Sequence, residues 1–126
     1  MKKVEQKAIK LAKYLFQKEI LDKDLSESFN GDIEDFFTEM KIALKNKFPN
    51  TKTKFKMKSI HYANNFQNEK LKNVAFILDD IEEILCFNGF SNHDKNVDFF
   101  NKTITQNDFE ISPENLVITA IDSLLQ

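Results

Sequence analysis

The chain has 126 residues, a hydrophobic content of 41% and a net charge of -2, values typical of one globular domain. A chain of this length buries enough surface to fold without disulfide bridges or a structural metal, and its one cysteine cannot form an internal bridge. We therefore expect a single domain over residues 1–126 in the reducing cytoplasm. No apolar run approaches the roughly twenty residues needed to cross a bilayer, so we expect no membrane partner.

Charged residues are distributed in blocks along the chain. Residues 1–23 and 43–72 are rich in lysine, whereas residues 24–42 and 73–126 are rich in acids; the last block holds two lysines and ten acids. All 18 basic side chains are lysines, so arginine forks are not available to bind phosphate or guanine. Such segregation favours a protein with one positive and one negative surface.

Two helices are predicted in the first half of the chain. Apolar residues from Val4 to Ile20 recur every three or four positions, which predicts an amphipathic helix over about residues 3–22. The same spacing from Ile33 to Leu44 predicts a second helix, which begins near Asp32 and ends before Pro49.

The period then changes from helical to alternating. In residues 51–60, lysines occupy every second position, so an extended strand would have one cationic face. Residues 74–87 fit either a helix or two paired strands around an acidic turn, and residues 103–111 resemble another short strand. Ser112 followed by Pro113 predicts the start of a final helix.

These elements predict an α+β fold, in which N-terminal helices and a C-terminal helix pack on a small antiparallel sheet. An all-α bundle is the alternative, and it applies if residues 60–87 are continuous helix.

The candidate catalytic residues are the two histidines and the cysteine, His61, Cys86 and His93. A thiol nucleophile needs a neighbouring base, but no nucleophile, phosphate-loop or zinc motif surrounds any of the three. Cys86 lies between Leu85 and Phe87, which is typical of a core thiol, and His93 lies in the polar segment SNHDKN, which is typical of a solvated histidine. We therefore expect no enzyme activity, no cofactor and no metal.

The acids of the last block are the candidate contacts for a protein partner. In size, acidity and lack of catalytic motifs, the chain resembles bacterial immunity proteins that neutralise toxins. This resemblance implies an inhibitor that binds a basic partner such as a nuclease toxin, with complementary charge accelerating association. The predicted contact residues are Asp79, Asp80, Glu82, Glu83, Phe90, Asp94 and Asp98.

Two alternative functions remain open. The lysine strip over residues 45–58 is interleaved with Phe48 and Phe55, which suits a nucleic-acid-associated regulator. The sequence pI of about 5.7 argues against nucleic acid, and a row of lysines also protects a strand edge from aggregation. The strip consists of Lys45, Lys47, Lys52, Lys54, Lys56 and Lys58.

The other alternative function is a structural or assembly subunit of a phage or secretion system.

Overall fold

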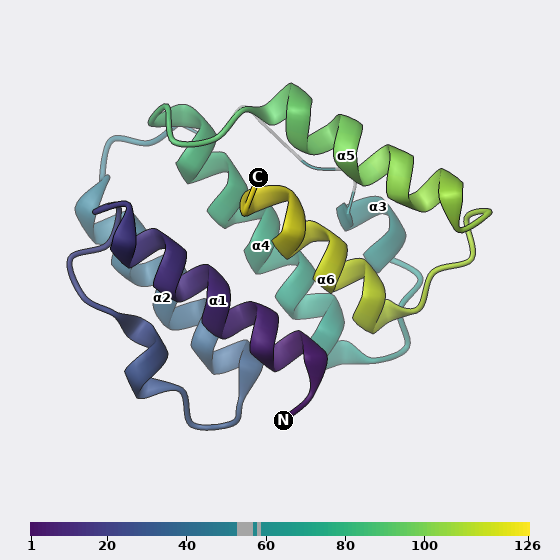
Figure 1. The fold of residues 1–126 in the computed structure, drawn as a ribbon, viewed down its shortest axis with the longest axis horizontal. Helices are drawn as coiled ribbons and strands as arrows, with labels where there is room; N and C mark the ends of the chain where they lie inside the picture. The colour runs from purple at the N-terminus through teal and green to yellow at the C-terminus, as the bar shows by residue number, and fades with distance from the viewer. Residues whose placement is uncertain (53–56, 58) are drawn as a thin grey trace.

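The computed structural model describes residues 1–52, 57 and 59–126 (Figure 1). Within this part of the chain there are six α-helices, one short 3₁₀-helix and no strand. Their order is α1 (Lys3–Gln17), η1 (Leu25–Ser28), α2 (Ile33–Lys47), α3 (Ser59–Ala63), α4 (Glu69–Phe87), α5 (His93–Gln106) and α6 (Pro113–Leu124). None of the helices in the described residues is both long enough and apolar enough to span a membrane.

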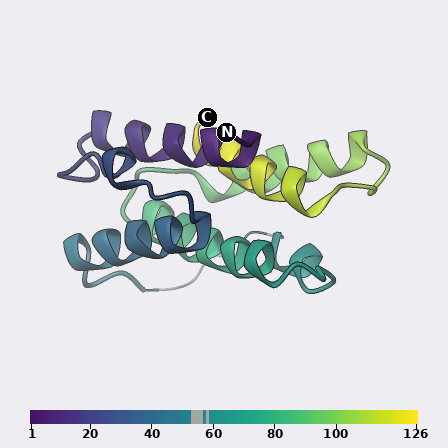
Figure 2. The same ribbon diagram turned by 90° about the horizontal axis from the view of Figure 1, so that it is seen from below.

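The helices form two layers of three (Figure 2). Helices α1, α6 and α5 lie side by side in one layer, and α2, α4 and α3 lie side by side in the other. The middle helices of the two layers, α6 and α4, contact each other across the interface. A middle helix has neighbours on both flanks as well as on the face that meets the other layer. This position decides the surroundings of the α4 side chains.

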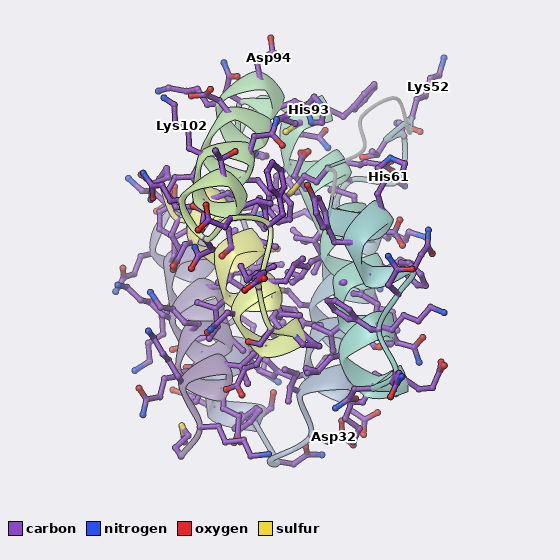
Figure 3. All side chains as sticks on the ribbon, turned by 90° about the vertical axis from the view of Figure 1, so that its right-hand side faces the viewer. Asp32, Lys52, His61, His93, Asp94 and Lys102 are labelled. Carbon is purple, nitrogen blue, oxygen red and sulfur yellow. The ribbon has the colours of Figure 1, made fainter. Side chains whose placement is uncertain are left out.

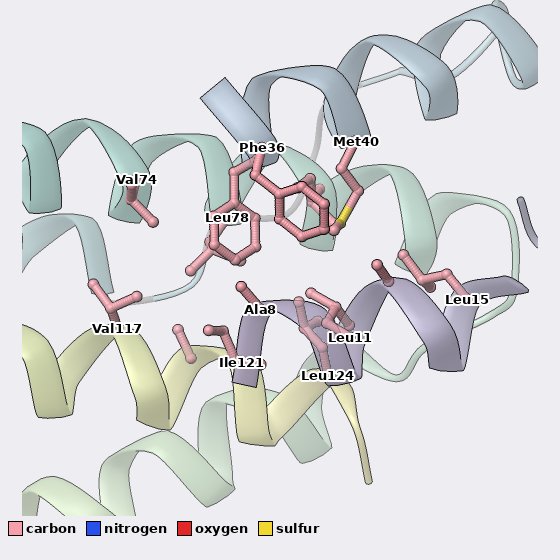
Figure 4. Packing of buried hydrophobic residues seen from close by; sticks show 14 of the residues in the cluster. Ala8, Leu11, Leu15, Phe36, Met40, Val74, Leu78, Val117, Ile121 and Leu124 are labelled. Carbon is pink, nitrogen blue, oxygen red and sulfur yellow. The ribbon is translucent and has the colours of Figure 1, made fainter. Parts of the chain in front are cut away.

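The hydrophobic core lies between the two layers (Figure 4). Leu11 of α1, Met40 of α2, Leu78 of α4 and Ile121 of α6 meet there, and all four side chains are fully buried. Phe100 of α5 extends the core to the remaining edge and packs against Tyr62 of α3, with 5.8 Å between the ring centroids. Removal of this apolar surface from water is the main favourable contribution to folding.

Side-chain caps mark where four of the helices begin. Asp32 accepts from the backbone N–H of Glu34 at 3.0 Å, and Asn68, Asn92 and Ser112 cap α4, α5 and α6 in the same way. Each cap satisfies a backbone donor that has no partner within its helix. The predicted helices from Asp32 and Ser112 are thus confirmed at their starting positions.

The first helix is confirmed but ends earlier than residue 22. Glu19 adopts a left-handed conformation with φ 60°, and the N–H groups of Ile20 and Leu21 both bond to the carbonyl oxygen of Leu15. This turn closes α1 at Gln17 and buries Ile20 and Leu21 in the core.

The predicted α+β fold is wrong, and the all-helical alternative fits the described residues. Residues 103–106 complete α5 instead of forming a strand, and Asp108 and Phe109 turn the chain with φ 52° and 62°. The β-branched residues at 103–105 favoured a strand. Ile104, however, lies one helical turn after Phe100, and burial of both side chains in the core favours the helix.

The predicted strand at 51–60 and the ambiguous segment at 74–87 have different outcomes. Residues 74–87 are helical, because all of them belong to α4. The predicted strand at 51–60 is contradicted at residues 59 and 60, which belong to α3. Its central residues, 53–56 and 58, lie outside the described part of the chain.

Candidate functional site

The four acids of α4 that we predicted to contact a partner are mostly buried. Asp79, Glu82 and Glu83 are at most 1% exposed. Asp80 is partly exposed, and its carboxylate lies 2.5 Å from Nζ of Lys41 on α2. The expectation that these carboxylates face solvent is therefore wrong for three of the four.

The position of α4 explains this burial. Residues 79, 82, 83 and 86 share one helix face because they are spaced by three, four and seven positions. Helices α2 and α3 flank α4, and α6 lies across it. The chain that leaves α2 also reaches the C-terminal end of α4, where Asn88 Nδ2 donates to Thr51 Oγ1 at 2.9 Å and the rings of Phe48 and Phe90 lie 5.4 Å apart.

Glu82 joins Cys86 and His93 in one cluster. The Glu82 side chain is fully buried, and its two carboxylate oxygens have different neighbours. Cys86 Sγ donates to Oε2 at 2.6 Å, and His93 Nδ1 lies 2.5 Å from Oε1. One potential ligand atom from each residue lies within 4.8 Å of the other two. We call these three residues the Glu82 cluster.

The environment of Cys86 does not favour a nucleophile. Burial raises the pKa of the Cys86 thiol, and the hydrogen bond to Glu82 and its negative charge raise that pKa further. A reactive cysteine requires a depressed pKa, so the cluster holds the sulfur in its unreactive thiol form. The remaining candidate base, His61, is exposed on α3 and is not one of the three cluster residues (Figure 3).

His93 is not the solvated loop residue that we expected. It is the first residue of α5, its side chain is 21% exposed, and its ring contacts the buried carboxylate of Glu82. Asn92 fixes this position by capping the helix through the Lys95 N–H at 3.0 Å. Sequence spacing could not show the contact, because it depends on how the turn between α4 and α5 folds back.

The other three predicted contact residues lie around the corner between α4 and α5. Phe90 is 42% exposed and Asp98 is also exposed. Asp94 is exposed near the start of α5 (Figure 3). Phe90 and Asp98 line a surface hollow together with Lys95 and Lys102, and Lys102 Nζ lies 2.9 Å from Asp98. The acids of this corner are thus accompanied by lysines, which reduces their attraction for a basic partner.

Sequence analysis missed a second acidic surface on η1 and α2. Glu27, Asp35 and Glu39 are exposed, and Ile42 is 53% exposed although it is strongly apolar. Residues 35, 39 and 42 share a helix face, and Ser28 Oγ bonds to Glu39 at 3.3 Å, which joins η1 to this face. We call Glu27, Asp35, Glu39 and Ile42 the α2 surface. The acidic block at 24–42 and the position of Ile42 outside the buried helical pattern could have revealed it.

The lysine strip at 45–58 is only partly described. Lys45 is exposed at the end of α2, Lys47 Nζ pairs with Asp22 at 2.8 Å, and Lys52 is exposed after the helix. The other three lysines lie outside the described residues.

A different group of lysines lies on α1. Lys7, Lys10 and Lys13 line a hollow with Tyr14, next to the C-terminal end of α6. Lys7 Nζ lies 2.6 Å from the carboxylate of Asp122, whereas Lys10 and Lys13 are exposed. This hollow is more basic than the hollow at the α4–α5 corner, because three lysines line it and two line the other.

Comparisons with known proteins assign no family to the chain. Protein-family models, curated proteins and solved structures all gave no match.

Proposed function

We propose that this chain is a small protein-binding protein of the inhibitor or immunity type, which acts in the cytoplasm on a basic partner such as a nuclease toxin. The observation that supports it is the α2 surface, where exposed Ile42 lies beside the exposed carboxylates of Asp35 and Glu39. An exposed apolar side chain supplies contact area at the centre of an interface. The neighbouring carboxylates accelerate association with a positively charged protein and fix its orientation, while exposed Lys45 lies one helical turn after Ile42 at the edge of this surface.

The α2 surface suits this role better than the acids predicted from the sequence. Buried carboxylates on α4 cannot meet a rigid partner, and the acids of the α4–α5 corner are accompanied by lysines. Helix α2 is also held in place by the burial of Phe36, Phe37 and Met40 in the core. Lys70 and Asn73 of α4 add exposed contacts at its first turn, with Lys70 Nζ 3.0 Å from Asp32 and Asn73 Nδ2 donating to Glu34 at 2.8 Å. A rigid contact surface loses less conformational entropy on binding.

The test compares two pairs of charge reversals that change the net charge equally. The partner is captured at low salt from the native cell with the wild-type chain, identified and purified, and its association rate is measured with each variant. D35K/E39K alters the α2 surface, and D94K/D98K alters the α4–α5 corner. We expect the first pair to slow association by at least about tenfold at low ionic strength, and less at high salt. We expect the second pair to change it little.

Other outcomes would reject the α2 surface or binding through acids altogether. Slower association only in D94K/D98K moves the contact to the corner around Phe90, as predicted from the sequence, and rejects the α2 surface. Normal association in both variants, or an acidic captured protein, contradicts binding through acidic side chains.

A second candidate function is association with nucleic acid, which the α1 hollow favours. Lys10, Lys13 and Tyr14 combine exposed ammonium groups with an aromatic ring, a combination that suits phosphate contact and base stacking. Binding of a single-stranded oligonucleotide is measured at increasing salt for the wild type and for K10E/K13E. A steep salt dependence that the variant loses would support this function. No binding at about 50 mM salt would reject it.

A further inference from the structure

The Glu82 cluster brings together three different metal-ligand types. A carboxylate oxygen, a thiol sulfur and an imidazole nitrogen are the donors that zinc proteins use. Glu82 and Cys86 lie four positions apart on one face of α4, and His93 is the first residue of α5. Two rigid helices therefore present the donors, which limits the reorganisation that binding a metal would require.

From this arrangement we propose that Glu82, Cys86 and His93 bind a divalent transition-metal ion of the zinc class, with one coordination position left for water or another ligand. This departs from our expectation from sequence spacing that the chain holds no metal. Zinc bonds of about 2.0–2.3 Å in a tetrahedral site place ligand atoms roughly 3.3–3.8 Å apart. The two contacts of 2.5 and 2.6 Å must therefore lengthen by about 1 Å when the metal binds.

The charge balance of the site fits a divalent ion. On binding, the S–H bond of Cys86 breaks, its electron pair forms the bond to the metal, and the proton leaves to solvent. His93 coordinates through Nδ1 as a neutral imidazole with its proton on Nε2, and no electron is transferred. One thiolate and one carboxylate then neutralise the two positive charges, which a buried site requires.

The surroundings provide both access and support. The His93 side chain is 21% exposed, and Ser91 and Asn96 connect the cluster to the hollow at the α4–α5 corner. Asn96 itself is 3% exposed, and its Nδ2 donates to Ser91 Oγ at 2.8 Å and lies 3.9 Å from Cys86 Sγ. An amide donor beside a metal-bound thiolate stabilises its negative charge, as outer partners commonly do in metal sites.

Titration of the full chain with Co(II) and then Zn(II) tests the proposal. The protein is reduced with a phosphine that does not bind the ions and is freed of chelator. We expect one Co(II) per chain with a thiolate-to-metal charge-transfer band in the near ultraviolet, and release of the Cys86 proton on binding. We expect Zn(II) to displace Co(II) and abolish the band. The band in the wild type identifies the sulfur ligand before any variant is made.

Variants then assign the ligands. We expect Cys86→Ser to remove the band and His93→Gln to weaken binding by more than about 100-fold, because loss of an outer partner alone costs 10–100-fold. His61→Gln is the matched control, since His61 is exposed on α3 outside the cluster, and it should bind like the wild type. Circular dichroism confirms that each variant is folded.

Three results would overturn the proposal. They are the absence of saturable binding at micromolar ion, binding without a thiolate band, and binding that depends on His61. The α2 surface lies on another helix, so failure of the metal site leaves the docking proposal standing, and the reverse also holds.

Discussion

Helices α2 and α4 lie next to each other in one layer and both carry clustered acids, but their carboxylates have opposite surroundings. Asp35 and Glu39 of α2 are exposed, whereas Glu82 and Glu83 of α4 are at most 1% exposed. The difference comes from position, because α2 lies at the edge of the layer and α4 lies in its middle. The place of a helix in the fold therefore decides whether its acids are exposed to a partner or buried against other side chains of the protein.

The largest expected effect comes from reversing one acid on each helix. We expect Glu82→Lys to lower the free energy of unfolding by about 3–5 kcal/mol, because it places a longer, positively charged side chain at a fully buried position and removes the carboxylate that contacts Cys86 and His93. We expect Glu39→Lys to change it by less than about 0.5 kcal/mol, because that residue is exposed. Urea unfolding followed by circular dichroism measures both values. Similar losses in the two variants would contradict the contrast between the helices.

A smaller effect concerns the ion pair that links the two helices, Lys41 with Asp80. Its side chains are 24% and 30% exposed, so solvent screens much of the attraction. A double-mutant cycle with Lys41→Met and Asp80→Asn should give a coupling energy of at most about 1 kcal/mol. A much larger coupling would show that Asp80 behaves like the buried acids of α4 and not like the acids of α2.

The third prediction concerns Cys86, whose pKa is raised mainly by burial and further by the hydrogen bond to Glu82 and its negative charge. A raised pKa means that the thiol form stabilises the fold fully below about pH 8.5, the pKa of an unfolded cysteine, and less as the pH rises above it. Between pH 8 and 10 the wild type should therefore lose more stability than Cys86→Ala. The native thiol should also react slowly with a disulfide reagent at pH 8, and faster in Glu82→Gln. Equal pH dependence in wild type and Cys86→Ala would contradict the burial of this thiol beside Glu82.

The helices that were predicted correctly have strong local determinants. Residues 3–17 and 33–47 combine helical spacing with a clear cap or a following turn, and Ser112 with Pro113 starts α6. Helix α5 was missed because its β-branched residues at 103–105 favour a strand locally, and only packing of Phe100 and Ile104 against the rest of the fold favours the helix. The predicted sheet rested also on the alternating lysines of residues 51–60 and on the apolar run at 74–87, which fits a helix or strands equally well.

The candidate sites were partly visible in the sequence. Once residues 74–87 are known to be helical, Glu82 and Cys86 must share a face. The approach of His93 could not be predicted, because it depends on the turn at residues 88–92. The burial of the α4 acids could not be predicted either, because an acid-rich helix face looks solvated until the neighbouring helices are placed around it.

Carboxyl labelling of the native protein tests the contrast between α2 and α4 most directly. The carboxylates are coupled to glycine ethyl ester with a carbodiimide, and mass spectrometry locates the modified residues before and after denaturation. We expect rapid native modification of Glu27, Asp35 and Glu39, and modification of Asp79, Glu82 and Glu83 only after unfolding. Equal native labelling of the two groups would contradict both the buried Glu82 cluster and the selection of the α2 surface as the partner contact.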